Sequence, residues 1–328
     1  MKAVICEAYG PPSELKVAEM TPAPLAPDCV RVRVAAAGIN FPDTLIIKGG
    51  YQLRPDFPFA PGFEVAGSIV ECGADVRDLA PGDYVVGLTA AGYGGFAEYA
   101  DVRAAEAVRV PDSIDEITAA AIYTAYGTAY HALVQRGGVK AGDWVVVLGA
   151  TGGVGLAAVD IASALGAKVV AVGSSEEKLA LASKAGASAT LVYREGQLSA
   201  DVRAATGGAA DICIDLVGGS AFTEMTRAMA WEGRLLVIGF TSGEIPSLAV
   251  NLLLLKGFSA VGVYWGRFAE RDPEGNARNF AHLWELLASR QIAPHIHRVL
   301  PMERAAEALD ELLARKVAGK LVLAPFGT

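Results

Sequence analysis

Hydrophobic and polar residues alternate in short β-like runs over roughly the first 110 residues of the chain. Turns rich in Pro and Gly, such as AYGPP and LAPGD, separate these runs. VRVRV has the period of two that is typical of a half-buried antiparallel strand. The pattern therefore predicts a mostly β domain with strands at residues 2–6, 30–38, 65–73, 83–88 and 96–102.

After about residue 118 the apolar runs become continuous, and helical segments lie between most of them. Such runs are typical of parallel strands that are buried on both faces of a sheet. They predict strands at residues 144–149, 168–173, 189–193, 211–218 and 234–240. Beyond these, the pattern predicts an amphipathic helix at 276–290, a strand and helix within 297–316, and a closing strand at 320–325. The fold class is α/β, a doubly wound parallel sheet plus the mostly β domain.

A glycine-rich loop, VLGATGGVG at residues 147–155, follows the first of the continuous apolar runs and opens a helix. Within a β-α-β unit, such a loop is typical of dinucleotide binding. Gly149 permits the tight turn, Gly152 lets the backbone approach the pyrophosphate, and Gly155 lets the helix pack closely on the strand. The helix N-terminus then offers free N–H groups to the phosphates. We expect the loop to bind a dinucleotide rather than to serve packing alone, through Gly149, Ala150, Thr151, Gly152, Gly153, Val154 and Gly155.

The end of the next parallel strand indicates which dinucleotide binds. An NAD site usually has Asp or Glu there, bonded to the ribose 2′-OH. Gly173, Ser174 and Ser175 occupy that place here, so no carboxylate repels a 2′-phosphate. Lys178 can bring a point charge to such a phosphate, and Tyr193 would close the other side of the adenosine pocket. We therefore predict NADPH as the cofactor.

Other interpretations of these residues stay open. The sequence SSEE that begins at Ser174 fits a capping box in which Ser174 is the helix N-cap. Both roles of Ser174 can hold, because a capping Ser still presents its hydroxyl at the strand end. Lys178 on its own fits a solvated surface lysine. Glu176 and Glu177 weigh against NADPH because they add negative charge close to the predicted phosphate site.

Composition limits the partners of the 328-residue chain. Its net charge of −8 argues against nucleic acid, because nothing offsets the repulsion of the phosphates. No apolar stretch reaches membrane-spanning length, and MKAVICEAYG lacks the apolar region of a secretory signal. Cysteines are few and form no C-x-x-C pair. We expect a cytoplasmic protein without nucleic-acid, membrane or metal partners.

Four stretches carry a resemblance to a known family, in the right order and at the right spacing. They are AAAGINFPDTLIIKGGY (35–51), PGFEVAGSIVECG (61–73), GDWVVVLGATGGVG (142–155) and GKLVL (319–323). The chain resembles the medium-chain dehydrogenase/reductase superfamily over nearly its whole length and, more narrowly, its zinc-free NADPH:quinone oxidoreductase branch.

The resemblance implies an architecture. Residues 121–264 would form a Rossmann NADP-binding domain. Residues 1–120, completed by about 265–328, would form a mostly β, GroES-like catalytic domain around a twisted barrel. The active site would be the cleft between the two domains. A homodimer is implied, in which the strand near 259–265 pairs across the interface.

The resemblance also bears on the metal. The zinc alcohol dehydrogenases of this superfamily carry a Cys where Asn40 stands, a His where Phe63 stands and a further Cys near Ala120. Without these ligands we predict no zinc, and alcohol oxidation then loses its means of lowering the pKa of the alcohol. Reduction of a conjugated acceptor needs no such help. We therefore predict hydride transfer from NADPH to a quinone or other conjugated carbonyl compound.

Candidate catalytic residues follow from the same resemblance. Asn40 and Tyr51 match positions that line the substrate cleft, where a hydrogen-bond donor stabilises developing negative charge. Asp43 would orient Asn40 or a water. The alternatives are turn chemistry for Asn40, a helix N-cap for Asp43 and an exposed loop aromatic for Tyr51. Leu45 stands where the family often has a second Tyr, which makes the pocket less polar. No residue is a strong general acid by sequence, so solvent would deliver the proton.

Further cofactor contacts implied by the resemblance are Thr124, Thr128, Gly239, Phe240, Val263, Tyr264, Arg315 and Lys320. The two threonines match positions beside the nicotinamide and its ribose, although a helix-interior Thr also bonds its own backbone. The stretches at 239–240 and 263–264 would hold the carboxamide through their backbone. The two basic residues match a position that sometimes reaches the cofactor phosphate, or they are solvated helix-end charges.

Two other functions remain open. One is an alkene reductase for enones, enoyl thioesters or haloacrylates on the same scaffold. The other is an NADPH-binding structural or regulatory protein with little turnover, since fold does not fix function.

Overall fold

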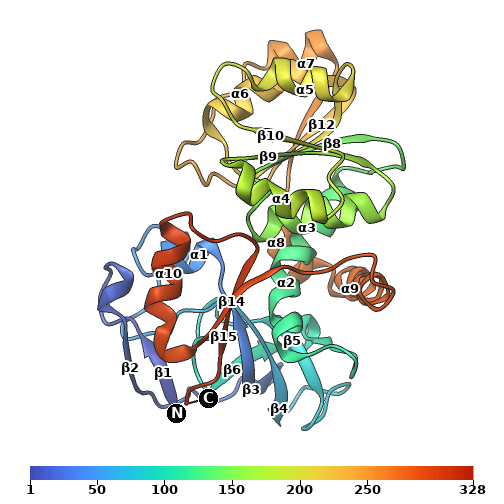
Figure 1. Ribbon diagram of the computed structural model, residues 1–328. Helices are drawn as coiled ribbons and strands as arrows, with labels where there is room; N and C mark the ends of the chain where they lie inside the picture. The colour runs from blue at the N-terminus through green and yellow to red at the C-terminus, as the bar shows by residue number, and fades with distance from the viewer. Residues whose placement is uncertain (328) are drawn as a thin grey trace. The chain divides into compact units, whose positions relative to one another are not determined.

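The computed structural model describes residues 1–327 and divides into two compact units (Figure 1). Unit 1 comprises Met1–Thr124, Asp272–Phe280 and Ile296–Thr328, and unit 2 comprises Ala125–Arg271 and Ala281–His295. The expected domains were 1–120 with 265–328, and 121–264. The largest difference is at 281–295, which belongs with unit 2 because its side chains pack there; for example, His282 Nδ1 lies 2.7 Å from the Tyr130 hydroxyl.

Unit 1 is the mostly β domain. Its strands are β1 (Lys2–Ile5), β2 (Lys16–Glu19), β3 (Cys29–Gly38), β4 (Glu64–Cys72), β5 (Tyr84–Leu88), β6 (Tyr99–Arg103), β7 (Val108–Arg109), β14 (Ile296–Pro301) and β15 (Lys320–Ala324). A seven-stranded sheet runs in the order β14-β15-β3-β4-β5-β7, and β6 also pairs with β3. Helices α1 (Phe41–Ile46) and α10 (Ala305–Leu313) belong to this unit, and α2 (Glu116–Tyr130) begins in it.

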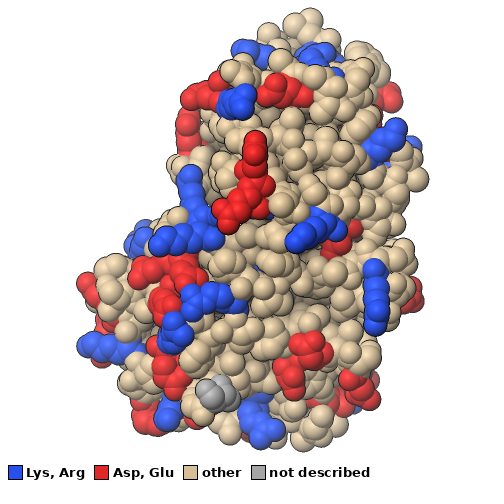
Figure 2. Space-filling view, viewed as in Figure 1, with Lys and Arg blue, Asp and Glu red and all other residues tan. Residues whose placement is uncertain are grey.

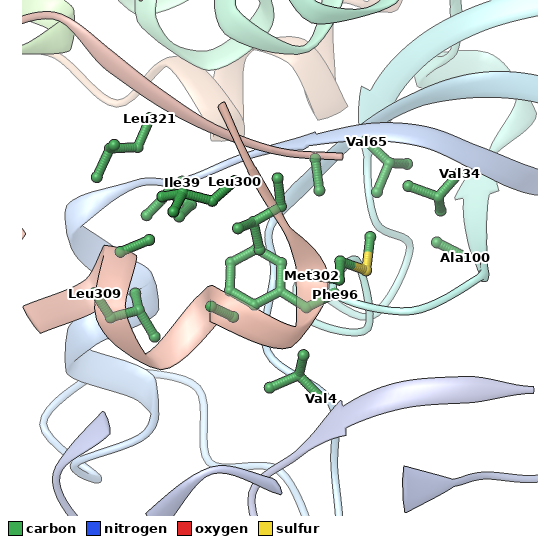
Figure 3. Packing of buried hydrophobic residues seen from close by; sticks show 14 of the residues in the cluster. Val4, Val34, Ile39, Val65, Phe96, Ala100, Leu300, Met302, Leu309 and Leu321 are labelled. Atoms are coloured by element: carbon green, nitrogen blue, oxygen red, sulfur yellow. The ribbon is translucent and has the colours of Figure 1, made fainter. Parts of the chain in front are cut away.

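The core of unit 1 joins residues from both ends of the chain. Figure 3 shows Val34, Val65 and Phe96 packed in one cluster with Met302 and Leu321. Alternate residues of β3 face inward, as its alternating sequence predicts, so its valines are buried. The C-terminal segment therefore completes the core that the N-terminal strands begin, and β15 enters the sheet beside β3.

Unit 2 holds a six-stranded parallel sheet in the order β10-β9-β8-β11-β12-β13. Its strands are β8 (Trp144–Leu148), β9 (Lys168–Gly173), β10 (Ala189–Val192), β11 (Ala210–Asp215), β12 (Met229–Val237) and β13 (Ser259–Gly262). Its helices are α3 (Gly153–Ala164), α4 (Glu176–Lys184), α5 (Leu198–Thr206), α6 (Gly219–Ala228), α7 (Asn251–Lys256) and α8 (Trp265–Arg271), and α9 (Pro273–Ala288) is shared with unit 1.

Helices cover both faces of this sheet, with α3 and α4 on one face and α5, α6 and α7 on the other (Figure 1). From β8 the chain winds outward through β9 to β10, and from β11 it winds the other way to β13. The strand order thus reverses between β8 and β11, which is where doubly wound sheets bind their ligands. The glycine-rich loop leaves β8 at this point. The predicted α/β fold class, a Rossmann-like parallel sheet with a mostly β GroES-like domain, is confirmed.

The surface carries both signs of charge. Lys and Arg side chains lie among Asp and Glu side chains over the face drawn in Figure 2. Within residues 1–327, no helix has the length and apolar character needed to cross a membrane.

Candidate active site

Four polar side chains of unit 1, Asn40, Asp43, Glu64 and Lys320, form what we call the Lys320 cluster. Asn40 precedes α1, Glu64 begins β4 and Lys320 begins β15. The pairing of β15 with β3, together with the bond from the Ile39 N–H to the Leu321 carbonyl, brings Lys320 to residues 280 positions away. Sheet register therefore assembles this cluster.

The ammonium of Lys320 is buried and uses all three of its N–H donors. Nζ lies 2.9 Å from the Ile39 carbonyl, 2.8 Å from Asn40 Oδ1 and 2.7 Å from Glu64 Oε1. A lysine ammonium has three donors and no acceptor. No donor of Lys320 therefore remains for another ligand.

The carboxylate of Glu64 is fully buried and holds two segments together. Oε1 accepts from Lys320 and, at 2.7 Å, from Asn40 Nδ2, while Oε2 accepts the Thr124 N–H at 2.7 Å. Gly38 makes room for it, since a Cβ at that position would lie 2.2 Å from Glu64 Oε1. The buried charges are thus paired and hydrogen-bonded, as burial of charge requires.

Asp43 is the third residue of α1 rather than its N-cap, so the N-cap interpretation of Asp43 is wrong. Asn40 is the N-cap, and its backbone N–H donates to Asp43 Oδ2 at 2.7 Å. The carboxyl group thus orients the backbone of Asn40. Burial raises the pKa of Asp43 to about 7, against the lowering effects of the Asn40 N–H and the Lys320 charge.

This raised pKa predicts a pH-dependent stability. Asp43 holds its proton more tightly in the folded than in the unfolded chain, whose pKa is near 3.8. Its contribution is therefore complete below pH 3.8 and is lost as pH rises to about 7, at up to about 1.4 kcal/mol per pH unit. We expect Asp43→Asn to remove this slope from the unfolding free energy of unit 1. Hydrogen-exchange mass spectrometry of unit 1 peptides between pH 4 and 8 measures it.

The matched control is Asp56→Asn, at an exposed position of the same unit. It should leave the slope of the native protein unchanged. Identical pH dependence in the native protein and Asp43→Asn would contradict the assignment.

The remaining unit 1 candidates lie as follows. Asn40 is half-buried, and its side chain bonds within the Lys320 cluster rather than only shaping a turn. Tyr51 is half-buried and packs edge-on against Phe63, with ring centroids 5.2 Å apart, rather than standing free on a loop. Thr124 Oγ1 is buried without a hydrogen-bond partner among the described residues, so the expectation that it bonds its own helix backbone is wrong. Leu45 is half-buried in α1.

The two basic candidates separate. Lys320 is not a solvated helix-end charge, because it is a buried residue of β15. It also has no N–H left for a cofactor phosphate, so the phosphate-binding role predicted for Lys320 does not agree with the structure. Arg315 is exposed just beyond α10 and has a positive φ of 55°.

The glycine-rich loop of unit 2 has the geometry that a dinucleotide loop needs. Gly149 has a φ of 74°, in the left-handed region that glycine favours. A Cβ at Gly155 would lie 2.1 Å from the Gly149 carbonyl oxygen, so only glycine lets α3 start this close to the loop. Gly152 precedes α3 and makes no side-chain cap, which leaves N–H groups of the first turn for an anion.

The end of β9 differs in one detail from the capping-box prediction. Helix α4 begins at Glu176, and its N-cap is Ser175, without a side-chain cap bond. The interpretation of Ser174 as the N-cap is therefore wrong, and Ser174 is exposed at the strand end. Lys178 is half-buried on α4, rather than fully solvated.

Tyr193 is fixed by a residue that sequence reasoning missed. Its hydroxyl lies 2.8 Å from Ser220 Oγ and donates to Glu224 Oε1 at 3.1 Å. Glu224 also accepts the Gly196 and Leu198 N–H groups at 3.0 and 2.9 Å. The buried Glu224 carboxylate therefore holds the whole loop that carries Tyr193.

Two family models match the chain, the alcohol dehydrogenase GroES-like domain at residues 26–112 and the zinc-binding dehydrogenase at residues 153–287. Quinone oxidoreductase-like protein 2 of Bos taurus is 39% identical over 98% of this chain and 92% of its own. Quinone oxidoreductase of Homo sapiens is 31% identical over 98% and 97%. The crystal structure of Escherichia coli quinone oxidoreductase complexed with NADPH has a TM-score of 0.91 at 28% identity, over 99% of this chain and 100% of that one.

The chain belongs to the quinone oxidoreductase branch of the medium-chain dehydrogenase/reductase superfamily. It is thus an oxidoreductase of the medium-chain type.

One of these family models is named for zinc binding, but the Lys320 cluster of this oxidoreductase does not fit a zinc ion. The ammonium of Lys320 already bonds Asn40 Oδ1 and Glu64 Oε1, and a metal ion there would meet a second positive charge. Phe63 and Ala120 offer no side-chain ligand atom. Within residues 1–327, no three His, Cys, Asp or Glu side chains are grouped to hold a metal.

A second missed residue, Asp215, organises the turn at the end of β11. Its Oδ1 accepts the Val217 and Gly218 N–H groups at 2.9 Å each. Its carbonyl accepts the Gly239 N–H at 3.3 Å, which fixes the start of the predicted carboxamide loop. The other residues predicted for cofactor contact, through the Thr128 side chain and the backbone at 239–240 and 263–264, range from buried to exposed: Thr128 and Val263 are buried, and Phe240 and Tyr264 are exposed.

The sequence contains a signal for the missed residues Glu64 and Asp215, and for the buried position of Lys320. Glu64 in FEVAG, Lys320 in KLVLA and Asp215 in ICIDLV are charged residues at or within apolar strand runs. A charge in a buried strand needs a partner. The need can be read from the sequence, but the identity of the partner cannot.

Proposed function

We propose that this oxidoreductase uses NADPH and, without zinc, transfers a hydride to a quinone or another conjugated carbonyl compound. The observation that carries the proposal is the half-buried Asn40 amide, which is anchored in the Lys320 cluster beside a buried cation. An amide donor that is held in a fixed orientation suits an acceptor oxygen that gains negative charge. Bound NADPH would supply the hydride from C4 of its nicotinamide.

Asn40 is the proposed donor to the acceptor oxygen. Its Nδ2 has two N–H groups, of which one bonds Glu64 and the other remains for the acceptor. Asp43 holds the Asn40 backbone, and Tyr51 lines the acceptor site. Solvent supplies the proton, so the protein contributes orientation and electrostatics.

The cofactor proposal assigns the pyrophosphate to the glycine-rich loop and the 2′-phosphate to Ser174 and Lys178. The uncapped start of α3 and the absence of a carboxylate at the end of β9 support it. The Escherichia coli relative was crystallised with NADPH. Thr124, Thr128, Arg315 and the backbone at 239–240 and 263–264 remain proposed cofactor contacts.

Lys178→Ala should raise the KM for NADPH about tenfold or more and leave the KM for NADH unchanged, since a charge-assisted bond to phosphate is lost. Steady-state kinetics with both cofactors measures the effect. Lys184→Ala, an exposed lysine on the same helix, is the control and should change neither KM. Equal effects on NADPH and NADH would show that Lys178 does not read the 2′-phosphate.

The acceptor is tested by following NADPH oxidation with a simple benzoquinone and a short-chain enone in parallel, and with NADH as a cofactor control. Faster reduction of the quinone is the expected result. Faster reduction of the enone would support an alkene reductase instead. Binding of NADPH without turnover of either acceptor would contradict the proposal and favour a binding protein.

We also propose a homodimer in which β13 pairs with its copy. β13 is the exposed edge strand of the unit 2 sheet, and the same unit has large apolar side chains that are exposed to solvent. Leu254 is 81% exposed and Trp231 is 71% exposed. Apolar exposure of this size is typical of an interface. Sedimentation equilibrium should give twice the 34.0 kDa chain mass, and a monomer mass at micromolar concentration would contradict it.

A further inference from the structure

We infer that Lys320 is a positioning residue that sets the orientation of the Asn40 side-chain amide. Through this amide it determines which donor the acceptor meets. The inference rests on the donor role proposed for Asn40. It replaces the cofactor-phosphate role that the sequence suggested for Lys320.

The chemistry of the three groups fixes the amide. An ammonium only donates hydrogen bonds and a carboxylate only accepts them. Oδ1 of Asn40 faces Lys320 Nζ at 2.8 Å, and Nδ2 faces Glu64 Oε1 at 2.7 Å. A rotation of the amide by 180° would place N–H groups against the ammonium and an oxygen against the carboxylate. Only one orientation therefore agrees with both neighbours.

This orientation determines what Asn40 offers to a ligand. One N–H of Nδ2 donates to Glu64, and the fixed orientation of the amide also fixes the direction of the second N–H within the amide plane. Asn40 is half-buried, whereas Asp43, Glu64 and Lys320 are buried. Asn40 is thus the side chain of the Lys320 cluster that a ligand can reach, and Lys320 acts through it.

The frame behind the amide is rigid. β15 pairs with β3 directly before the segment that leads to Asn40, and the Lys320 ammonium also bonds the Ile39 carbonyl. The Asn40 backbone is held separately by Asp43. Loss of the Lys320 ammonium therefore leaves the side chain of Asn40 with its Glu64 bond alone, while its backbone anchor stays. Sites supported by strands and buried partners keep their geometry better than sites on loops.

The kinetic test is a double-mutant cycle with Lys320→Met and Asn40→Ala. Lys320→Met should lower kcat for quinone reduction about 100-fold, the scale of a misplaced catalytic contact, with the Kd for NADPH unchanged. The double variant should be no slower than Asn40→Ala alone, because Lys320 acts through Asn40. Multiplicative losses would show that the Lys320 charge acts directly, and a native kcat in Lys320→Met would also overturn the inference.

Loss of the fold is controlled by a second variant. Lys320→Met with Glu64→Gln replaces the buried ion pair by neutral groups and keeps an acceptor for the Thr124 N–H. This double variant should fold and bind NADPH, but its kcat for quinone reduction should be as low as that of Lys320→Met alone. Recovery of native kcat in it would overturn the inference.

A spectroscopic readout separates this inference from the proposed function. The asparagines are Asn40, Asn251, Asn276 and Asn279, so side-chain ¹⁵N labelling of asparagine gives few NH₂ signals. Asn40→Ala identifies the signal of Asn40. In the native protein the N–H that donates to Glu64 should exchange slowly with water, and Lys320→Met should speed this exchange at least tenfold. Unchanged exchange would overturn the inference even if the native protein reduces no acceptor, whereas absent turnover with the expected exchange would fault only the proposed function.

Discussion

Replacement of Glu64 by leucine should lower the unfolding free energy of unit 1 by about 3–5 kcal/mol, the usual cost of breaking a buried ion pair. The variant leaves the Lys320 ammonium buried without its counter-ion, because Glu64 Oε1 lies 2.7 Å from Nζ and both side chains are buried. It also leaves the Thr124 N–H without its hydrogen-bond acceptor, Glu64 Oε2. Both losses act in the same direction.

The measurement needs a probe inside unit 1. All of the tryptophans, Trp144, Trp231, Trp265 and Trp284, lie in unit 2, so tryptophan fluorescence would miss the effect. Hydrogen-exchange mass spectrometry of peptides covering β4 and β15 reports it directly. The control is Glu64→Leu with Lys320→Met, which removes both charges and should recover part of the loss. A double variant no more stable than Glu64→Leu would contradict the ion-pair explanation.

Substitution of Gly155 by alanine should disrupt unit 2 and the NADPH binding that we propose for it. The new Cβ would lie 2.1 Å from the Gly149 carbonyl oxygen and 2.8 Å from the Ala150 Cα, which are backbone atoms that cannot rotate away. Overpacking of this kind costs about 1–3 kcal/mol or more. Here tryptophan fluorescence in urea is suitable, because the tryptophans lie in unit 2.

Gly152→Ala is the matched control in the same loop. A Cβ there meets only the Gly149 carbonyl oxygen at 3.7 Å, and the backbone φ of −79° suits any residue. The fold should therefore be kept. If Gly152 allows close approach of the pyrophosphate, the control should still weaken NADPH binding. Equal destabilisation by both substitutions would contradict the packing role of Gly155.

The sequence predicts most of the fold because the strands of unit 2 are short apolar runs in a parallel sheet. Errors lie where the pattern is weak. β2 was not predicted because all four of its residues are exposed. β12 begins at Met229, whereas the sequence predicts a start at 234. The first part of the strand was missed because it contains the exposed Trp231 and the irregular Glu232, which has a φ of 59°. β11 ends at Asp215, whose carboxylate turns the chain through the N–H groups that follow.

The site was predictable as a set of motifs but not as a set of contacts. The resemblance pointed to Asn40 and Lys320 through separate stretches of sequence. Their bond joins residues 280 positions apart, and it depends on the register between β15 and β3. A single sequence does not contain that register. Lys320 was therefore assigned to a phosphate, and Glu64 was left without a role.

The central claim, hydride transfer without a metal, is tested most directly with chelated protein and NADPH deuterated stereospecifically at C4. We predict that metal-free protein reduces the quinone, that one C4 epimer yields NADP⁺ without deuterium, and that the other yields NADP⁺ that retains it. Turnover that requires added zinc, or equal loss of deuterium from both epimers, would contradict the claim.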